Sequence, residues 1–397
     1  METAMETAMN KEERSAPPGA EGDPAYASAT VLSAAANFIM DRPEPFTHTF
    51  VTYIRTREQG ALRLKLWHSN AVDSTWDQGQ DSRAGIPGGE WQIESAWFAA
   101  GGRKDGQIAY EDRIPVTFGG SRGKRVLPGE CFWSDEASVE LPEGQDLVFG
   151  WTLRTVSGGK TIPFNVEDML ATAYDGPGTG EQPGALTLSE KLLVLPAYIG
   201  YRKQVRRKLA FFGDSITQGV RTARDGYEYW AAKIADGLGP ETSVYNLGSG
   251  WARAYDASGG GPWLGKMSGC DEALLVLGVN DLDIGRRTAE ELLGDLGELV
   301  ARLKSGRPDL RIMLGTVPPF NMEDEREREW REVNRRLREN PPRGTDAVFD
   351  IAAVLSEPAP REHRIRSEYM SGEYDPHPNG LAGTAVAEAF LAWYRQP

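Results

Sequence analysis

The second half of the chain alternates short apolar runs with amphipathic stretches of helical length. The apolar runs cover residues 209–212, 243–247, 273–277, 312–317 and 347–351, and the helical patterns cover residues 227–238, 288–304, 323–339 and 381–394. This alternation predicts a parallel sheet with helices on both faces, because parallel strands need a crossover that packs back onto the sheet. Ligands of such sheets bind beyond the carboxyl ends of the strands. Polar residues directly after the apolar runs are therefore the first candidates for a site.

The first half of the chain has a different pattern, with short strands in place of helices. The segments 46–55, 61–68, 90–98 and 146–154 are partly alternating and rich in β-branched and aromatic residues. Several such strands with no convincing helix between them predict an antiparallel β-sandwich of jelly-roll type. Residues 174–183 (YDGPGTGEQP) have the composition of a loop.

A length of 397 residues is sufficient for two domains with separate cores. We expect a disordered tail over residues 1–26, because this segment is polar and repetitive. A β-sandwich domain is expected over residues 27–200 and an α/β domain over residues 201–397. The basic run 202–208 lies at their junction, and we expect it to be a solvated edge rather than a binding patch.

Composition excludes several classes of partner. The formal net charge of −14 disfavours nucleic acid and anionic lipid, because polyanions would be repelled. No run of apolar residues is long enough to span a membrane. Cys131 and Cys270 fit no metal-ligand spacing and are expected to be reduced thiols, so no metal or other cofactor is predicted. The N-terminus has no basic segment followed by an apolar one. We therefore expect a cytoplasmic protein, although a trimmed leader would look similar.

Ser215 follows the first apolar run of the α/β region. The string 211–219 (FFGDSITQG) places this serine in a Gly-Asp-Ser turn at the carboxyl end of a predicted strand. A serine hydroxyl is a poor nucleophile unless a base lies beside it, so the position alone indicates little. Asp214, its neighbour, is a further candidate for contact with a substrate.

Two more polar segments follow the next apolar runs. Gly248 (in NLGSG, 246–250) would let the backbone approach a substrate and leave its N–H free to donate. Asn280 (in GVND, 278–281) could aim its amide at the same point. Tetrahedral intermediates of acyl transfer need such donors, each worth roughly 3–4 kcal/mol. Each segment alone is also typical of an ordinary turn, with a turn glycine or a helix-capping asparagine.

A general base would come from the few histidines. The chain has 4, and His48 and His68 lie in the strand-rich half, which leaves His363 and His377. His363 lies in a polar loop and is expected to be solvated. His377, in the string 373–379 (EYDPHPN), lies between two prolines directly before the last predicted helix. Its position is therefore expected to be rigid, as a base requires.

Together, these four strings resemble the four sequence blocks of the SGNH hydrolases, also called the GDSL esterase/lipase family. The resemblance covers residues 208–394, about half of the chain. It implies a flavodoxin-like three-layer fold, with Ser215 as the nucleophile and His377 as the general base. By the same resemblance the N–H of Ser215, Gly248 and Asn280 form the oxyanion hole.

The position of the catalytic acid departs from the pattern of the family. The acid usually lies three residues before the histidine, where this chain has Tyr374. Asp375 lies two residues before His377, and Glu373 lies four before it. We favour Asp375, with Glu373 or a Ser–His dyad as the alternatives. Triad members are recognised by geometry, so spacing does not decide among them.

The substrate is predicted more weakly than the chemistry. A β-sandwich ahead of such a domain resembles bacterial carbohydrate esterases, including acetylxylan esterases. Trp251 and Trp263 could stack on a sugar ring, and Arg253 could line the pocket with Trp251, although structural roles are the alternative. No apolar lid is obvious, which favours short acyl groups. We expect deacetylation of a carbohydrate, with a small-molecule or oligosaccharide ester as substrate. The alternatives are a general short-chain carboxylesterase and a carbohydrate-binding protein with a degenerate hydrolase domain.

Overall fold

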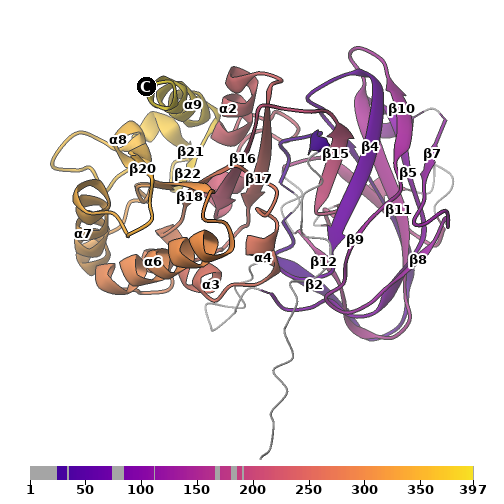
Figure 1. Cartoon of the computed structure of the whole chain (residues 1–397), viewed down its shortest axis with the longest axis horizontal. Coiled ribbons are helices and arrows are strands. Elements are labelled where there is room, and N and C mark those ends of the chain that lie inside the picture. Colours follow the sequence, from indigo (N-terminus) through magenta and orange to yellow (C-terminus); the bar gives the residue numbers. More distant parts are fainter. Residues whose placement is uncertain are drawn as a thin grey trace, which may run out of the picture.

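The computed structural model describes residues 25–33, 35–73, 85–110, 112–165, 170–179, 186–189 and 192–396. The predicted disordered tail lies outside the described residues except for its last two positions. Of these, Tyr26 already begins strand β1 (Tyr26–Ser28). The chain forms a strand-rich N-terminal region and an α/β region that lie side by side (Figure 1).

The predicted parallel sheet of the α/β region is confirmed. It contains β16 (Arg207–Gly213), β17 (Thr242–Gly248), β18 (Glu272–Val276), β19 (Arg311–Gly315) and β20 (Ala347–Phe349). All neighbouring strands pair in parallel, in the order β17-β16-β18-β19-β20. This is the strand order of flavodoxin-like doubly wound sheets, in which the ligand site lies where the order reverses, beside the first strand. Here that strand is β16, directly before Ser215.

Helices cover both faces of this sheet. They are α1 (Ser215–Gln218), α2 (Trp230–Leu238), α3 (Ala254–Ser258), α4 (Pro262–Gly265), α5 (Val279–Asp283), α6 (Ala289–Gly306), α7 (Asp324–Glu339), α8 (Ile351–Leu355) and α9 (Gly380–Tyr394). Successive side chains of β16 point to opposite faces: Phe211 packs in one core with Trp230 of α2, and Phe212 packs in another with Leu292 of α6. In Figure 1, α2 and α9 lie above the sheet and α6 lies below it.

The N-terminal region is antiparallel and strand-rich, as predicted, but its jelly-roll form is not confirmed. One sheet contains β1, β15 (Tyr198–Arg202), β4 (Gly60–Ser69), β10 (Ala137–Leu141) and β9 (Cys131–Trp133). A second contains β14 (Thr187–Leu188), β13 (Ala173–Pro177), β3 (Thr47–Ile54), β11 (Asp146–Thr155), β5 (Trp91–Lys104), β6 (Gln107–Tyr110), β7 (Ile114–Val116) and β8 (Lys124–Val126). A third pairs β12 (Gly159–Phe164) with β2 (Phe38–Arg42).

The loop predicted over residues 174–183 is wrong at its start. Residues 174–177 belong to β13, which pairs with β3. Tyr174 is buried in a core cluster with Val51 and Trp97, and this tertiary contact outweighs the turn-forming glycine and proline that follow. Residues 180–183 lie outside the described part of the chain.

The two regions share a continuous core. One hydrophobic cluster contains Leu64 of β4 together with Phe211 of β16. The boundary predicted between residues 200 and 201 falls inside β15, so that the connection to the α/β region comes after Arg202. Cys131 and Cys270 are free thiols. No helix of the described residues is both long and apolar enough to cross a membrane.

Candidate active site

Ser215 is the first residue of α1, directly beyond the carboxyl end of β16. Asp214 caps this helix, because its Oδ1 accepts a hydrogen bond of 2.9 Å from the Ile216 N–H. The turn needs glycine at position 213, where a Cβ would lie 2.1 Å from Thr217 Oγ1 and 2.4 Å from a backbone oxygen of β18. The Gly-Asp-Ser string therefore forms the tight strand-to-helix turn that presents the serine.

The structure brings Ser215 together with His377 and Asp375. Ser215 Oγ lies 3.1 Å from His377 Nε2, and His377 Nδ1 lies 2.6 Å from Asp375 Oδ1. The same carboxylate oxygen accepts a hydrogen bond of 3.1 Å from the His377 N–H. Both residues belong to β22 (Asp375–Pro378), which pairs with β21 (Met370–Gly372) and leads into α9. A hydroxyl, an imidazole and a carboxylate are thus aligned in the way that nucleophilic catalysis requires.

Two further side chains contact this group of residues: Arg221 meets Asp375 and Phe320 meets His377. The sequence analysis predicted neither of them. Arg221 Nε lies 2.9 Å from Asp375 Oδ2. The ring of Phe320 meets the His377 ring edge to face, at 5.1 Å between centroids and 87° between planes. Neither residue belongs to one of the four strings, so no sequence signal placed them at the site.

The pKa of the Asp375 carboxyl is lowered from its usual value. Burial, the largest influence, raises this pKa, but the hydrogen bonds from the His377 side chain and N–H outweigh it. The positive charge of Arg221 acts in the same direction as these hydrogen bonds. The carboxylate is therefore held in its charged form, which is the form that accepts a hydrogen bond from an imidazole.

Gly248 does not have the free N–H that we predicted. Its N–H donates to Asn246 Oδ1 at 2.9 Å, and its carbonyl oxygen accepts a hydrogen bond of 2.7 Å from Ser33 Oγ. A Cβ at position 248 would lie 2.1 Å from the backbone nitrogen of Gln218. The residue is a glycine because β17 and α1 pack this closely.

Two other donors are available near the carboxyl ends of β17 and β18. Asn280 Nδ2 donates to the Ala252 carbonyl oxygen at 3.0 Å, which uses one of the two N–H groups of that amide. Gly250 is buried, and no hydrogen bond from its N–H to another described residue is found. The neighbouring Ser249 N–H donates to the Gly213 carbonyl oxygen at 2.9 Å, which ties this segment to the turn before Ser215.

The predicted substrate contacts are mostly buried. Trp263 is 0% exposed, stacks on Phe212 at 3.8 Å and donates its Nε1–H to the Leu247 carbonyl oxygen, so it is a core residue. Asp214 is 1% exposed. Its pKa is raised to about 7 by burial. Arg253 is 7% exposed and makes a forked ion pair with Asp256. Trp251, 40% exposed, is the one predicted contact that a substrate could reach.

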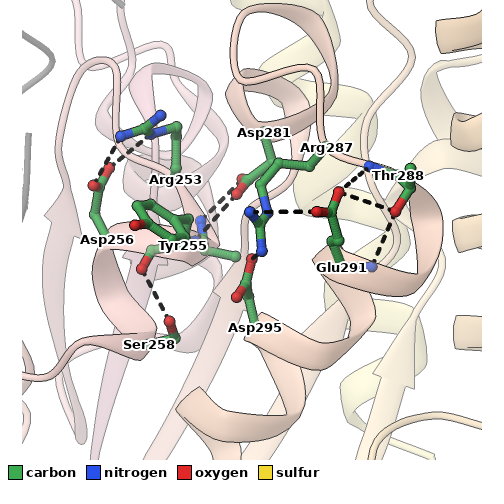
Figure 2. A network of polar contacts seen from close by, with 10 residues as sticks. Arg253, Tyr255, Asp256, Ser258, Asp281, Arg287, Thr288, Glu291 and Asp295 are labelled. Atoms are coloured by element: carbon green, nitrogen blue, oxygen red, sulfur yellow. Dashed lines mark hydrogen bonds and ion pairs between the residues drawn. The ribbon is translucent and has the colours of Figure 1, made fainter. Parts of the chain in front are cut away.

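A polar network holds α3, the helix that follows Trp251 in the chain, in place (Figure 2). The Asp281 carboxylate accepts hydrogen bonds from the backbone N–H groups of Ala254 and Tyr255, at 2.9 and 3.1 Å. Arg287 lies over the Tyr255 ring, 4.8 Å from its centroid, and pairs with Asp295 at 2.7 Å. Burial raises the pKa of Asp281 to about 6. The network fixes α3 against α5, which also carries Asn280.

The alternative base, His363, is not solvated as predicted. It is 8% exposed, and its Nδ1 lies 3.1 Å from Glu327 Oε1 and 3.0 Å from Arg331 Nη2 on α7. The polar loop packs against this charged helix, which local composition does not reveal. Among the described residues, no group of three or more His, Cys, Asp or Glu side chains could hold a metal ion.

Residues 211–382 match the model of the GDSL-like lipase/acylhydrolase family. None of the curated proteins compared with the chain matches it. A family two carbohydrate esterase from Cellvibrio japonicus is 13% identical over 93% of this chain and 96% of its own, with a TM-score of 0.37. A family 3 carbohydrate esterase from Talaromyces cellulolyticus is 16% identical over 47% of this chain and 96% of its own, with a TM-score of 0.36. Both TM-scores are below 0.5. The family match over residues 211–382 supports an ester hydrolase.

Proposed function

We propose that this chain, whose α/β region matches the GDSL-like lipase/acylhydrolase family, is a serine ester hydrolase that works through an acyl-enzyme. The observation that carries the proposal is the contact from Ser215 Oγ to His377 Nε2, at 3.1 Å, continued from His377 Nδ1 to Asp375 at 2.6 Å. A carbohydrate-binding protein with a degenerate hydrolase domain would not need a serine, a histidine and an aspartate aligned in this way.

The proposed reaction has two halves. His377 Nε2 accepts the proton of Ser215 as Oγ attacks the ester carbonyl carbon. The bond to the alcohol then breaks, and the imidazolium returns its proton to the leaving oxygen. His377 then deprotonates a water molecule that attacks the acyl carbon. The bond from this carbon to Ser215 Oγ breaks, the acid is released, and the imidazolium returns its proton to Oγ. Asp375 orients the imidazole and stabilises its charged form while the proton is held there.

Hydrogen-bond donors must meet the oxyanion that develops on the carbonyl oxygen. We assign this role to the N–H of Ser215 at the start of α1 and to the second N–H of the Asn280 amide. Gly248, which uses its N–H on Asn246, is replaced in this proposal by Gly250. Gly250 follows the same strand and lies in the segment tied to the turn before Ser215.

We propose a short acyl group, most simply acetyl, on a carbohydrate as the substrate. Two exposed aromatic residues support a sugar: Trp251, 40% exposed, adjoins Gly250, and Tyr374, 87% exposed, adjoins Asp375. The negative face of an aromatic ring attracts the C–H groups of a sugar ring. The second candidate is a general short-chain carboxylesterase, which the burial of Trp263 favours because it removes one of the predicted stacking faces.

The test compares the wild type, Ser215→Ala and Trp251→Ala. Each is assayed on aryl esters from acetate to octanoate and on acetylated xylo-oligosaccharide. We expect wild-type turnover to be fastest on acetate and to be abolished by Ser215→Ala. Ser121→Ala, at an exposed serine, is the matched control and should keep wild-type activity. Trp251→Ala is expected to raise KM for the oligosaccharide and not for aryl acetate. An equal effect on both would favour the general carboxylesterase, and no turnover on any ester would refute the proposed function.

A further inference from the structure

We propose that Arg221 is a positioning residue that holds the Asp375 carboxylate against His377, and that the N-terminal strand-rich region fixes the loop that presents Arg221. The inference rests on the proposed serine hydrolase function and deepens it. It gives the N-terminal region a role in the reaction although that region contributes none of the groups that react.

The two oxygens of Asp375 have separate partners. Oδ1 faces His377 Nδ1 at 2.6 Å and the His377 N–H at 3.1 Å, while Oδ2 faces Arg221 Nε at 2.9 Å. Asp375 is only two residues from His377, on the same short strand, and both of its hydrogen bonds with His377 use Oδ1. A carboxylate held at both oxygens cannot rotate away from the imidazole. Arg221 therefore supplies from another loop the restraint that the short spacing lacks.

The loop that carries Arg221 has a conformation that other contacts must impose. It connects α1 to α2 and spans residues 219–229. Three of its non-glycine residues have positive φ: Arg221 at 72°, Asp225 at 59° and Tyr227 at 50°. Such residues rarely adopt this region, and it persists where the surrounding structure determines it.

The N-terminal region supplies those contacts. The Asp225 carboxylate accepts hydrogen bonds from Tyr53 Oη of β3 at 2.8 Å, and from the N–H and Oγ1 of Thr172 at 2.7 and 2.5 Å. Tyr227 Oη accepts a hydrogen bond of 3.0 Å from the Arg55 N–H, and the Arg55 guanidinium lies 4.4 Å from the Tyr227 ring centroid. Backbone and side-chain groups of the N-terminal region thus hold the loop at Asp225 and Tyr227, a few residues beyond Arg221.

The ion pair between Arg221 and Asp375 is suited to positioning rather than to stabilising the fold. The Arg221 side chain is 51% exposed and that of Asp375 is 32% exposed. Ion pairs with this much solvent contribute little to stability. Replacing Arg221 should therefore leave the protein folded while it releases the carboxylate. A displacement of about 1 Å at a catalytic group can lower a rate by about 10²-fold.

The test is a double-mutant cycle on aryl acetate, with Arg221→Ala, Asp375→Ala and the double variant. We expect Arg221→Ala to lower kcat by about 10- to 100-fold with little change in KM, because orientation and not binding is lost. In the Asp375→Ala background the same change should cost less than about twofold, because Arg221 acts through Asp375. Arg221→Lys should restore part of kcat, and millimolar guanidinium should raise the kcat of Arg221→Ala but not of Asp375→Ala. Arg328→Ala, an exposed arginine on α7, is the matched control.

Asp225→Asn tests the contribution of the N-terminal region. It removes one acceptor from the anchor to Tyr53 and Thr172, and we expect kcat to fall in the same way as in Arg221→Ala, with no further fall when the two are combined. An Arg221→Ala variant with wild-type kcat, or an equal loss in the Asp375→Ala background, would overturn this inference alone. Asp225→Asn with full activity would overturn the role of the N-terminal region. Absence of wild-type turnover would overturn the proposed function and the inference with it.

Discussion

A buried ion pair joins Lys266 and Asp73, which belong to the two different regions of the chain. Lys266 Nζ lies 2.5 Å from Asp73 Oδ2, and the two side chains are 1% and 0% exposed. Asp73 Oδ2 also accepts a hydrogen bond of 2.8 Å from the Ala36 N–H. Burial raises the pKa of Asp73 above its ordinary value of 3.8, and the charge of Lys266 offsets part of this. Removing one partner of such a pair leaves a buried charge uncompensated, which typically costs about 3–5 kcal/mol.

A Lys266→Met variant should lose free energy of unfolding, and protonation of Asp73 sets an upper limit on this loss. To protonate a carboxyl of ordinary pKa 3.8 costs about 1.4 kcal/mol per pH unit above that value. The limit is therefore about 4 kcal/mol at pH 7 and about 2 kcal/mol at pH 5. In the variant the folded-state pKa lies above the unfolded one, so stability is lost as pH rises. We expect the variant to be least stable, relative to wild type, at the higher pH.

The assay is urea unfolding followed by circular dichroism at pH 5 and pH 7. The double variant Lys266→Met/Asp73→Asn should recover most of the loss at pH 7, because it removes the buried charge and keeps an oxygen for the Ala36 N–H. Arg328→Met, in an ion pair whose side chains are 73% and 80% exposed, should cost less than about 0.5 kcal/mol. A Lys266→Met loss below about 1 kcal/mol at pH 7, or one that does not change with pH, would refute this reasoning.

Four other outcomes are expected. Asp375→Ala removes two hydrogen bonds to His377, each worth about 1.5–3 kcal/mol, so kcat should fall by about 10²- to 10⁴-fold in steady-state assays; a fall below tenfold would indicate a Ser–His dyad. Asn280→Ala should lower kcat by about 10²- to 10³-fold if its amide meets the oxyanion, and unchanged kcat would exclude that role. Trp263→Ala should lower the free energy of unfolding by about 3–5 kcal/mol, whereas Trp251→Ala should change it little; equal losses would contradict the burial described above. Because burial raises the pKa of Asp214 to about 7, its contribution to stability is lost as pH rises from about 4 to 7. In Asp214→Asn the free energy of unfolding should therefore depend less steeply on pH over that range. An unchanged pH dependence would contradict the raised pKa of Asp214.

The local pattern of the sequence was sufficient for the parallel strands and the long helices of the α/β region, and for selecting Ser215 and His377 as candidates. Strand and helix periods are properties of adjacent residues, so the parallel sheet was predicted within a few residues of its observed bounds. Ser215 and His377 could be selected because each lies in a string at the end of a strand or before a helix. The carboxyl ends of parallel strands share one edge of a sheet, which brings such strings together.

What the sequence left open depended on contacts between distant segments. Asp375 and Glu373 differ little as residues, and only the path of β22 brings one of them to His377. Trp251 and Trp263 look equivalent in sequence, but one is 40% exposed and the other packs on Phe212 in the core. Burial and partners are set by how layers pack, which a local pattern does not encode.

Arg221 and Gly248 show most clearly that individual polar contacts cannot be predicted from the local sequence pattern. Arg221 lies in a loop without a motif, and its contact with Asp375 depends on a loop conformation in which Arg221 itself has positive φ. Gly248 matched an expected donor, yet the neighbouring Asn246 side chain takes its N–H. The sequence by itself determined the parallel sheet and selected Ser215 and His377 as the candidate nucleophile and base. Only the tertiary structure decided which carboxylate lies against His377, which cation meets that carboxylate and which N–H groups already have a partner, because a hydrogen bond forms only where packing brings two groups within reach.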